Sequence, residues 1–474
     1  MRVLLISTYE LGHQPLHIAS PAQALRRCSH QVRCVDTSID PWQPSETDDV
    51  DIVAISVPMH TAMRLALDIA RTIRARHPEL PICLYGLYGG VARDHTLGPV
   101  ADRLIAGEYE TALCDWVDGH HDTTITYLER TPRGLPARDL LPPLTRYARL
   151  LIDGEERVAA GVQASHGCAS RCRHCPVPAV YDGRIRIVSS ETVLADIDQA
   201  VALGAAHITF TDPDFLNGPH HSLRVVRAMH QRHPNLTFDL TTKIELILRH
   251  RDLWTELASS GCLFVTTALE CVDDNILAIL DKGHTAAHAG EAIRLLRSAG
   301  IEPRPSLLPF TPWTTLSGLA DLVDFAIDNQ LVGNIDPVHW TIRLLIPDHS
   351  LLLTQPEMRT YLDGYDAELL GWRWHAADPN IDVLQRDLAL LVEADVVAIH
   401  EPTDTFNKVA EKIARAADRT FPQVQARPTT APRLTEAWFC CAEPTCEQRT
   451  QTPDRTPFEV SRSTAHRSPQ RSRL

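Results

Sequence analysis

Short apolar segments of strand length alternate with amphipathic segments of helix length along most of this 474-residue chain, and this rhythm limits the fold more than any other feature. The run RVLLIS at 2–7 is short, branched and apolar, as expected of a strand buried in a parallel sheet. The first series predicts strands at 2–7, 31–36, 51–57, 81–85 and 101–106, with helices at 21–28, 61–76 and 111–119. Residues 1–122 are therefore predicted to form an open, doubly wound, Rossmann-like α/β domain.

The alternation restarts after residues 123–160, which contain several prolines, show little periodicity and are interpreted as a linker. The second series predicts strands at 161–165, 207–212, 237–242, 263–269, 302–309 and 339–346, with helices at 190–203, 221–233, 245–259, 286–299 and 315–328. Six such units predict an incomplete (β/α)6 barrel over 161–350 instead of the usual eight-unit barrel. A mostly helical C-terminal region at 351–436, with helices at 357–366, 383–394 and 406–419, and a cysteine-containing, partly disordered tail at 437–474 complete the chain.

Three cysteines with the spacing Cys-x3-Cys-x2-Cys follow the first strand of the second series, at Cys168, Cys172 and Cys175. Their thiolates can converge on one metal centre, and thiolates suit both zinc and iron–sulfur clusters. A 4Fe–4S cube has four irons, so three protein ligands would leave one iron open for a small molecule. A structural zinc site instead closes with four ligands, and His166 or His174 could supply the fourth. The alternatives are thus an iron–sulfur catalyst and a non-catalytic structural zinc or electron-relay protein.

The loop resembles the cluster-binding loop of the radical S-adenosylmethionine (SAM) superfamily, in which the same spacing follows the first strand of a six-unit partial barrel. His174 stands where that family usually has an aromatic residue. The resemblance implies a 4Fe–4S cluster, reductive cleavage of SAM, and a 5′-deoxyadenosyl radical that removes hydrogen from a substrate. It also implies an electron donor of flavodoxin or ferredoxin type. The substrate, a small molecule or a peptide, is not indicated by the sequence.

Polar residues follow the second, third and fourth strands of the barrel, on the side where parallel barrels carry their chemistry. SAM needs carboxylates for its ammonium and ribose, and a cation or hydroxyl for its carboxylate. The resemblance implies that Asp212 and Asp214 meet the methionine amino group and that Glu270 contacts the cofactor, while Lys243 could pair with the methionine carboxylate. The alternative for each is a strand-end salt bridge. A glycine-punctuated turn at 280–285 could also lie near the cofactor.

The first series resembles the cobalamin-binding domain that precedes the barrel in many radical SAM enzymes. The resemblance implies cobalamin at the carboxyl ends of the strands, at 8–14, 57–60 and 86–90, and methylation or rearrangement of the substrate. The signature Asp-x-His-x-x-Gly is absent, and His13 and His60 lie at strand ends without that context. The alternative is a Rossmann-like domain that binds nothing or only part of a substrate.

The run CCAEP at 440–444 resembles the ending of a small radical SAM subgroup named for its CUAEP or CCAEP tail, where U is selenocysteine. A position that accepts sulfur or selenium indicates redox or nucleophilic chemistry, because the thiolate is the reactive form. We therefore predict catalytic thiols at Cys441 and Cys440, with Cys440 or Cys446 resolving Cys441. A second metal site and an inert tail are the alternatives.

The remaining sequence features exclude several partners. Lys and Arg number 46 against 60 Asp and Glu, and the resulting net charge of −14 disfavours non-specific binding to nucleic acid. No apolar stretch approaches the ~20 residues of a membrane span, and the first residues lack the basic region and cleavage site of a signal peptide. The 12 cysteines are spread along the chain, which favours a reducing compartment, so a cytoplasmic protein is expected.

Overall fold

The parallel sheet predicted for residues 1–122 is present in the computed structural model, which describes residues 1–436 except 92, 121, 131–132, 399–400 and 426–430. Its six parallel strands have the order β2-β1-β3-β4-β5-β6. The strands are β1 (Arg2–Ser7), β2 (Gln31–Asp36), β3 (Ile52–Ser56), β4 (Ile82–Tyr85), β5 (Arg103–Gly107) and β6 (Thr126–Tyr127). The helices are α1 (Leu16–Arg27), α2 (His60–Arg76), α3 (Arg93–Thr96) and α4 (Glu110–Val117).

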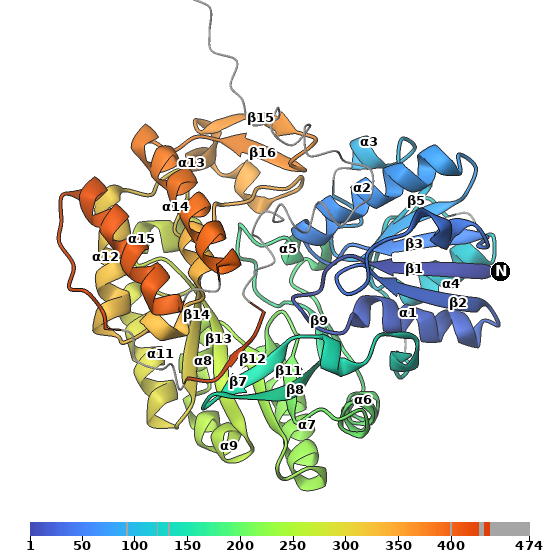
Figure 1. The fold of residues 1–474 in the computed structure, drawn as a ribbon, viewed down its shortest axis with the longest axis horizontal. Helices are drawn as coiled ribbons and strands as arrows, with labels where there is room; N and C mark the ends of the chain where they lie inside the picture. Colours follow the sequence, from blue (N-terminus) through green and yellow to red (C-terminus); the bar gives the residue numbers. More distant parts are fainter. Residues whose placement is uncertain (92, 121, 131–132, 399–400, 426–430, 437–474) are drawn as a thin grey trace, which may run out of the picture.

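Helices cover both faces of this sheet, because successive strand residues point to opposite sides. Leu4 and Ile6 of β1 pack in the cluster that contains α2, whereas Val3 and Leu5 pack in the cluster that contains α1 and α4. The strand order reverses at β1, and ligands of such sheets bind at the carboxyl ends of the strands near the reversal. The N-terminus lies at the outer edge of the molecule, so these carboxyl ends face the rest of the chain (Figure 1).

The second sheet contains five parallel barrel strands and two antiparallel additions, in the order β14-β13-β12-β11-β8-β7-β17. The strands are β7 (Arg149–Ile152), β8 (Glu155–Val162), β11 (His207–Phe210), β12 (Thr237–Thr241), β13 (Cys262–Glu270), β14 (Glu302–Leu307) and β17 (Arg433–Leu434). The helices between them are α6 (Ser190–Ala202), α7 (Pro219–Arg232), α8 (Ile244–Arg249), α9 (Trp254–Ser259), α10 (Asp274–Ile279), α11 (Ala286–Ser298) and α12 (Leu316–Asp328).

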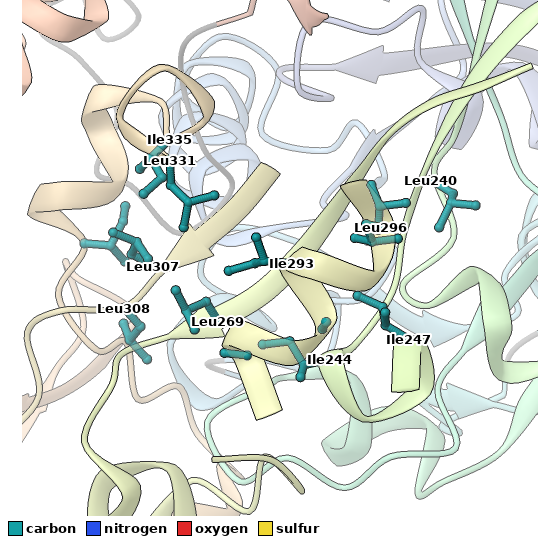
Figure 2. Close-up of a cluster of buried hydrophobic side chains, with 14 of the residues drawn as sticks. Leu240, Ile244, Ile247, Leu269, Ile293, Leu296, Leu307, Leu308, Leu331 and Ile335 are labelled. Atoms are coloured by element: carbon teal, nitrogen blue, oxygen red, sulfur yellow. The ribbon is translucent and has the colours of Figure 1, made fainter. Parts of the chain in front are cut away.

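The apolar core of the barrel lies between its strands and the surrounding helices, and Figure 2 shows the part beside α8 and α11. Ile244 and Ile247 of α8 meet Ile293 and Leu296 of α11 there, all of them buried. Successive side chains of a strand point to opposite faces, and those of β11 that alternate with its apolar residues are polar. His207 and Thr209 of β11 both hydrogen-bond Asp239 of β12, at 2.9 and 2.7 Å. These buried polar side chains satisfy one another inside the barrel.

The prediction of a sixth barrel strand at 339–346 is wrong. The segment begins with a 3-10 turn at Pro337–Thr341 and keeps one parallel bridge, between Phe310 and Arg343. The Arg343 guanidinium instead pairs with Asp382 at 2.5 Å and lies 3.5 Å from the centre of the Trp374 ring. Contacts with the C-terminal region thus hold this segment in place of a strand ladder.

The predicted linker at 123–160 also requires correction, because its end belongs to the barrel sheet. Strands β7 and β8 form an antiparallel hairpin around Asp153 and Gly154, whose φ angles are +52° and +80°. An Asp-Gly pair in this conformation makes a two-residue turn that matches the twist of a hairpin. The turn signal was in the sequence, and the interpretation of the whole stretch as a linker missed it.

The C-terminal region contains two of its three predicted helices, as α14 (Pro379–Val397) and α15 (Pro402–Ala417). The helix predicted at 357–366 is wrong: α13 (Pro356–Arg359) ends early and is followed by the hairpin of β15 (Leu362–Asp366) and β16 (Gly371–Trp374). Tyr365 pairs with Trp372 across this hairpin, and such aromatic pairs stabilise strands. In the described part of the chain, no helix is both long and apolar enough to cross a bilayer.

Candidate radical SAM site

The cysteine loop leaves β8 and lies at the carboxyl end of the barrel. The short strands β9 (Ser165–Gly167) and β10 (Ile185–Ile187) pair at its base, and α5 (Val177–Tyr181) lies between them in the chain. Cys168 and Cys172 are buried, Cys175 is half-buried, and all three are free thiols. Burial raises the pKa of Cys168 and raises that of Cys175 to about 12. These thiols would thus need a cation or metal to ionise near neutral pH.

A side chain would not fit at Gly167, the residue directly before Cys168. Its φ is +71°, and a Cβ atom there would lie 2.2 Å from the Arg184 carbonyl oxygen and 2.7 Å from the Tyr181 ring. Only glycine combines this left-handed conformation with such close approach. The glycine before Cys168 therefore fixes the direction in which the loop leaves the sheet.

Neighbouring elements bind the backbone of the loop. The Asn217 side-chain oxygen accepts from the Ala169 N–H at 3.1 Å, and the Lys243 ammonium donates to the Ser170 hydroxyl at 3.2 Å. On the other side, the Arg173 backbone N–H donates to the Leu280 carbonyl at 2.9 Å and its guanidinium to the carbonyl of Ile279 at 2.9 Å. The loop is thereby docked on the C-terminal end of α10, whose last carbonyls would otherwise lack donors.

The predicted site residues Asp212 and Asp214 lie at the carboxyl end of β11, and both carboxylates hold neighbouring loops. Asp212 accepts from the Ser165 hydroxyl at 2.6 Å and from the Ala164 N–H at 3.0 Å. Asp214 accepts from the Thr242 hydroxyl at 2.7 Å and also from the backbone N–H groups of two residues, Leu216 and Lys243, at 3.1 Å each. Burial raises the pKa of each aspartate to about 6. These contacts brace the mouth of the barrel.

Glu270 and Lys243 contact different residues of the cysteine loop, His174 and Ser170 respectively. A β-bulge at the end of β13 and a φ of +64° at Glu270 determine the direction of its side chain. This left-handed backbone conformation costs a non-glycine residue about 1–2 kcal/mol. The Glu270 carboxylate accepts from the Lys282 ammonium at 2.8 Å, and the His174 ring nitrogen Nε2 lies 3.3 Å away. Burial would raise the pKa of Glu270, but Lys282 and His174 hold that pKa below its usual range. Lys282 belongs to the turn at 280–285 that the sequence placed near the cofactor.

The two histidines considered as fourth zinc ligands each pair with a carboxylate: His174 with Glu270, and His166 with Glu108 at 3.1 Å. Among the described residues, no three His, Cys, Asp or Glu side chains converge closely enough to bind one metal ion. Three thiolates that each bind a different iron of a cube need not meet at one point. The lack of a convergent group of this kind is therefore compatible with three cysteines on one short loop that each bind a different iron.

Buried polar atoms around the loop also fit a polar ligand. Within the described part of the chain, no hydrogen-bond partner is present for the buried Asn217 side-chain nitrogen or for the Nδ1 atoms of His174 and His284. Buried polar groups in proteins are rarely left unpaired, so each such atom indicates a missing partner. SAM carries both donors and acceptors that could serve them.

The β1 loop of the N-terminal domain turns toward the barrel. His13 is buried, and a Cβ atom at Gly161 of β8 would lie 3.4 Å from its side chain. Burial lowers the pKa of His13 to about 4, so this imidazole is neutral near pH 7. A cavity of about 340 Å³ opens beside this loop, lined among others by Tyr9, Trp42 and Leu65. It lies at the strand ends where a ligand of the Rossmann-like domain was expected, whereas His60 is the first residue of α2.

Two further polar clusters, which the sequence did not indicate, join the domains. Arg138 is fully buried and donates to Asp196 of α6, to the Gly161 carbonyl and to the Gln14 side chain. Glu108, at the end of β5, accepts from His166 and from the Tyr181 hydroxyl at 2.9 Å. Both clusters connect the N-terminal domain to the segment directly before Cys168. Cys440, Cys441 and Cys446 lie outside the described residues.

Comparison with known proteins defines the class of the barrel. Residues 162–326 match the family model described as the radical SAM superfamily. This match supports the predicted resemblance of the barrel, and radical SAM enzymes are homologous to this protein.

Particular relatives extend the similarity beyond the barrel. The chain is 24% identical over 335 residues to the hopanoid C-3 methylase of Methylococcus capsulatus, covering 63% of this chain and 62% of that protein. It is 23% identical over 278 residues to the hopanoid C-2 methylase of Rhodopseudomonas palustris, covering 57% and 51%. The chain thus spans between half and two thirds of the length of these curated relatives.

Solved structures show the same fold. OxsB, described as a cobalamin-dependent SAM radical enzyme with aqua-cobalamin and SAM bound, has a TM-score of 0.66 at 14% identity, covering 83% of this chain and 67% of that one. TsrM from Kitasatospora setae, a radical SAM methyltransferase also solved with cobalamin and a [4Fe-4S] cluster, has a TM-score of 0.56 at 16% identity, covering 74% and 73%. The fold is therefore shared with proteins whose structures were solved with these cofactors bound.

Proposed function

We propose that this chain is a radical SAM enzyme in which Cys168, Cys172 and Cys175 hold a 4Fe–4S cluster and leave one iron for SAM. The observation that carries the proposal is the loop itself: three free cysteines, buried or half-buried, on one short segment at the carboxyl end of a partial barrel. When bound, such a cluster supplies one low-potential electron that cleaves SAM to methionine and a 5′-deoxyadenosyl radical.

The residues of the chain hold the loop and shape the mouth of the barrel around it. Asp212 and Asp214 fix the ends of neighbouring strands, and Asn217 fixes the loop backbone. Lys243 extends along the loop to Ser170, where it could also meet the carboxylate of SAM. These residues do not define the identity of the substrate.

We further propose that the N-terminal domain binds cobalamin and that the reaction transfers a methyl group to an inert carbon. The cavity at the carboxyl ends of β1 and β2 and the fold shared with OxsB and TsrM support this proposal. Cobalamin, when bound, supplies the methyl group. Rearrangement of the substrate is the alternative outcome. The reactive Cys441 and Cys440 remain a prediction from the sequence.

Anaerobic reconstitution with iron and sulfide tests the proposal. We expect a brown protein with about four irons per chain, a 4Fe–4S electron paramagnetic resonance signal after reduction, and conversion of SAM to 5′-deoxyadenosine. Alanine at Cys168, Cys172 and Cys175 together should abolish all three, whereas Cys34→Ala, a change in β2, should not. Colourless protein with stoichiometric zinc would refute the proposal. A corrinoid absorbance spectrum of the purified protein tests cobalamin separately.

A further inference from the structure

Two lysines approach the cysteine loop, and each is paired with a glutamate. Lys243 lies 3.3 Å from Glu245, and that glutamate side chain is 33% exposed. Lys282 lies 2.8 Å from Glu270, with only 3% and 9% of the two side chains exposed. Charges shielded from water act over longer distances than exposed ones, so the Lys282–Glu270 pair has the stronger influence on its surroundings.

The fold brings the Lys282–Glu270 pair next to the cysteine loop. The helix α10 ends in a turn at Asp281, and its final carbonyls accept from Arg173, which lies between Cys172 and Cys175 in the chain. Glu270, the partner of Lys282, lies 3.3 Å from the ring of His174, the residue directly before Cys175. The ion pair therefore lies beside the segment that joins Cys172 and Cys175.

Stability alone does not explain this pair. Two charges lose their hydration when they are buried, and apolar residues of similar volume often stabilise a protein equally well. Glu270 also adopts a left-handed backbone conformation to reach Lys282, and the β-bulge at Ala268 re-aims its side chain. A bulge that turns a charged residue toward a site is typical of functional positions.

We propose that the Lys282–Glu270 pair sets the reduction potential of the cluster held by Cys168, Cys172 and Cys175. Reduction adds one electron to the cluster, so a nearby positive charge favours the reduced state and a negative charge disfavours it. Lys282 raises the potential, and Glu270 offsets part of that effect. The inference rests on the proposed function, because it requires the cluster.

Redox titration of the reconstituted protein, with dithionite as electron donor and paramagnetic resonance as readout, tests the pair. Glu270→Gln should shift the midpoint potential upward, and Lys282→Met should shift it downward. The double variant restores the net charge and should return close to the original value. The exposed control Glu245→Gln should shift the potential upward by less than Glu270→Gln does.

Opposite shifts distinguish this role from a structural one, because loss of the same ion pair as a brace would perturb both single variants in the same direction. Equal or absent shifts in variants that retain four irons would overturn the inference while leaving the proposed function intact. If Glu270→Gln loses its iron, Lys282→Met and the double variant decide the question, and a rise in potential in Lys282→Met overturns the inference. An unsubstituted protein without a cluster would refute the proposed function and this inference together.

Discussion

Replacing Arg138 by methionine would test how the two domains are joined. The guanidinium is fully buried and makes a two-point contact with Asp196 at 2.6 and 2.8 Å, while it also donates to Gln14 at 2.8 Å and to the Gly161 carbonyl at 2.7 Å. Methionine would leave the Asp196 carboxylate buried without its counter-ion. Breaking a buried pair in this way costs about 3–5 kcal/mol. The unpaired acceptors on Gln14 and Gly161 add to that cost.

Hydrogen exchange followed by mass spectrometry would measure the effect in the peptides that contain the β1 loop and α6. We expect their opening free energy to fall by about 3–5 kcal/mol, up to the limit set by global unfolding. Arg26→Ala is the control, because Arg26 pairs with Asp139, which follows Arg138 in the chain, but these two side chains are 35% and 63% exposed. That pair should contribute about 0–1 kcal/mol. Equal effects of the two substitutions would refute the reasoning.

Further predictions concern the loop, the β1 turn and the tail. Gly167→Ala should lower iron incorporation and should reduce the free energy of unfolding by about 1–3 kcal/mol more than Gly154→Ala, because of these two glycines only Gly167 lacks space for a Cβ atom. Iron analysis and unfolding assays would measure both effects, and equal effects of the two substitutions would contradict the prediction. His13 has a folded pKa of about 4 against 6.5 unfolded, so its contribution is present above pH 6.5 and is lost as pH falls toward 4. In His13→Asn, the free energy of unfolding should therefore fall less steeply between pH 6.5 and pH 4 than in the unsubstituted protein. An unchanged pH dependence would argue against a lowered pKa of His13. Cys441 should react with iodoacetamide faster than buried Cys83 in mass-spectrometric labelling; equal rates would refute its predicted reactivity.

Local patterns predicted the central strands of both sheets, which are buried on both faces, whereas the short strands β6, β7 and β17 were not predicted. Strands buried on both faces need branched apolar residues, and runs like RVLLIS carry that information within six positions. The sixth barrel strand was predicted from the same kind of run, but its backbone follows Arg343 toward Asp382 and Trp374 in the C-terminal region. A local sequence pattern cannot show a contact such as that of Arg343 with Asp382, 39 positions away in the chain.

The candidate site was likewise predicted only where its residues lie close together in the sequence. The spacing of the three cysteines is local and was recognised, and Lys282 lies in a turn that the sequence placed near the cofactor. Its pairing with Glu270 was not predicted, because a bulge at the end of β13 determines where that carboxylate points. Likewise, Arg138 reaches Gln14 across 124 positions, so only the folded chain shows that the supposed linker contains a buried polar contact between the domains.

Three buried carboxylates fix the stretch that leads into the cysteine loop, and they come from different parts of the chain. Asp196 acts through Arg138 on the Gly161 carbonyl, Asp212 binds Ala164 and Ser165, and Glu108 of the N-terminal domain binds His166. Buried polar contacts add little stability compared with apolar packing, but each accepts only one geometry. We infer that they fix the distance and orientation between the cysteine loop and the ligand edge of the N-terminal sheet. An apolar interface of similar area would tolerate sliding, whereas two cofactors that act on one substrate require a fixed separation.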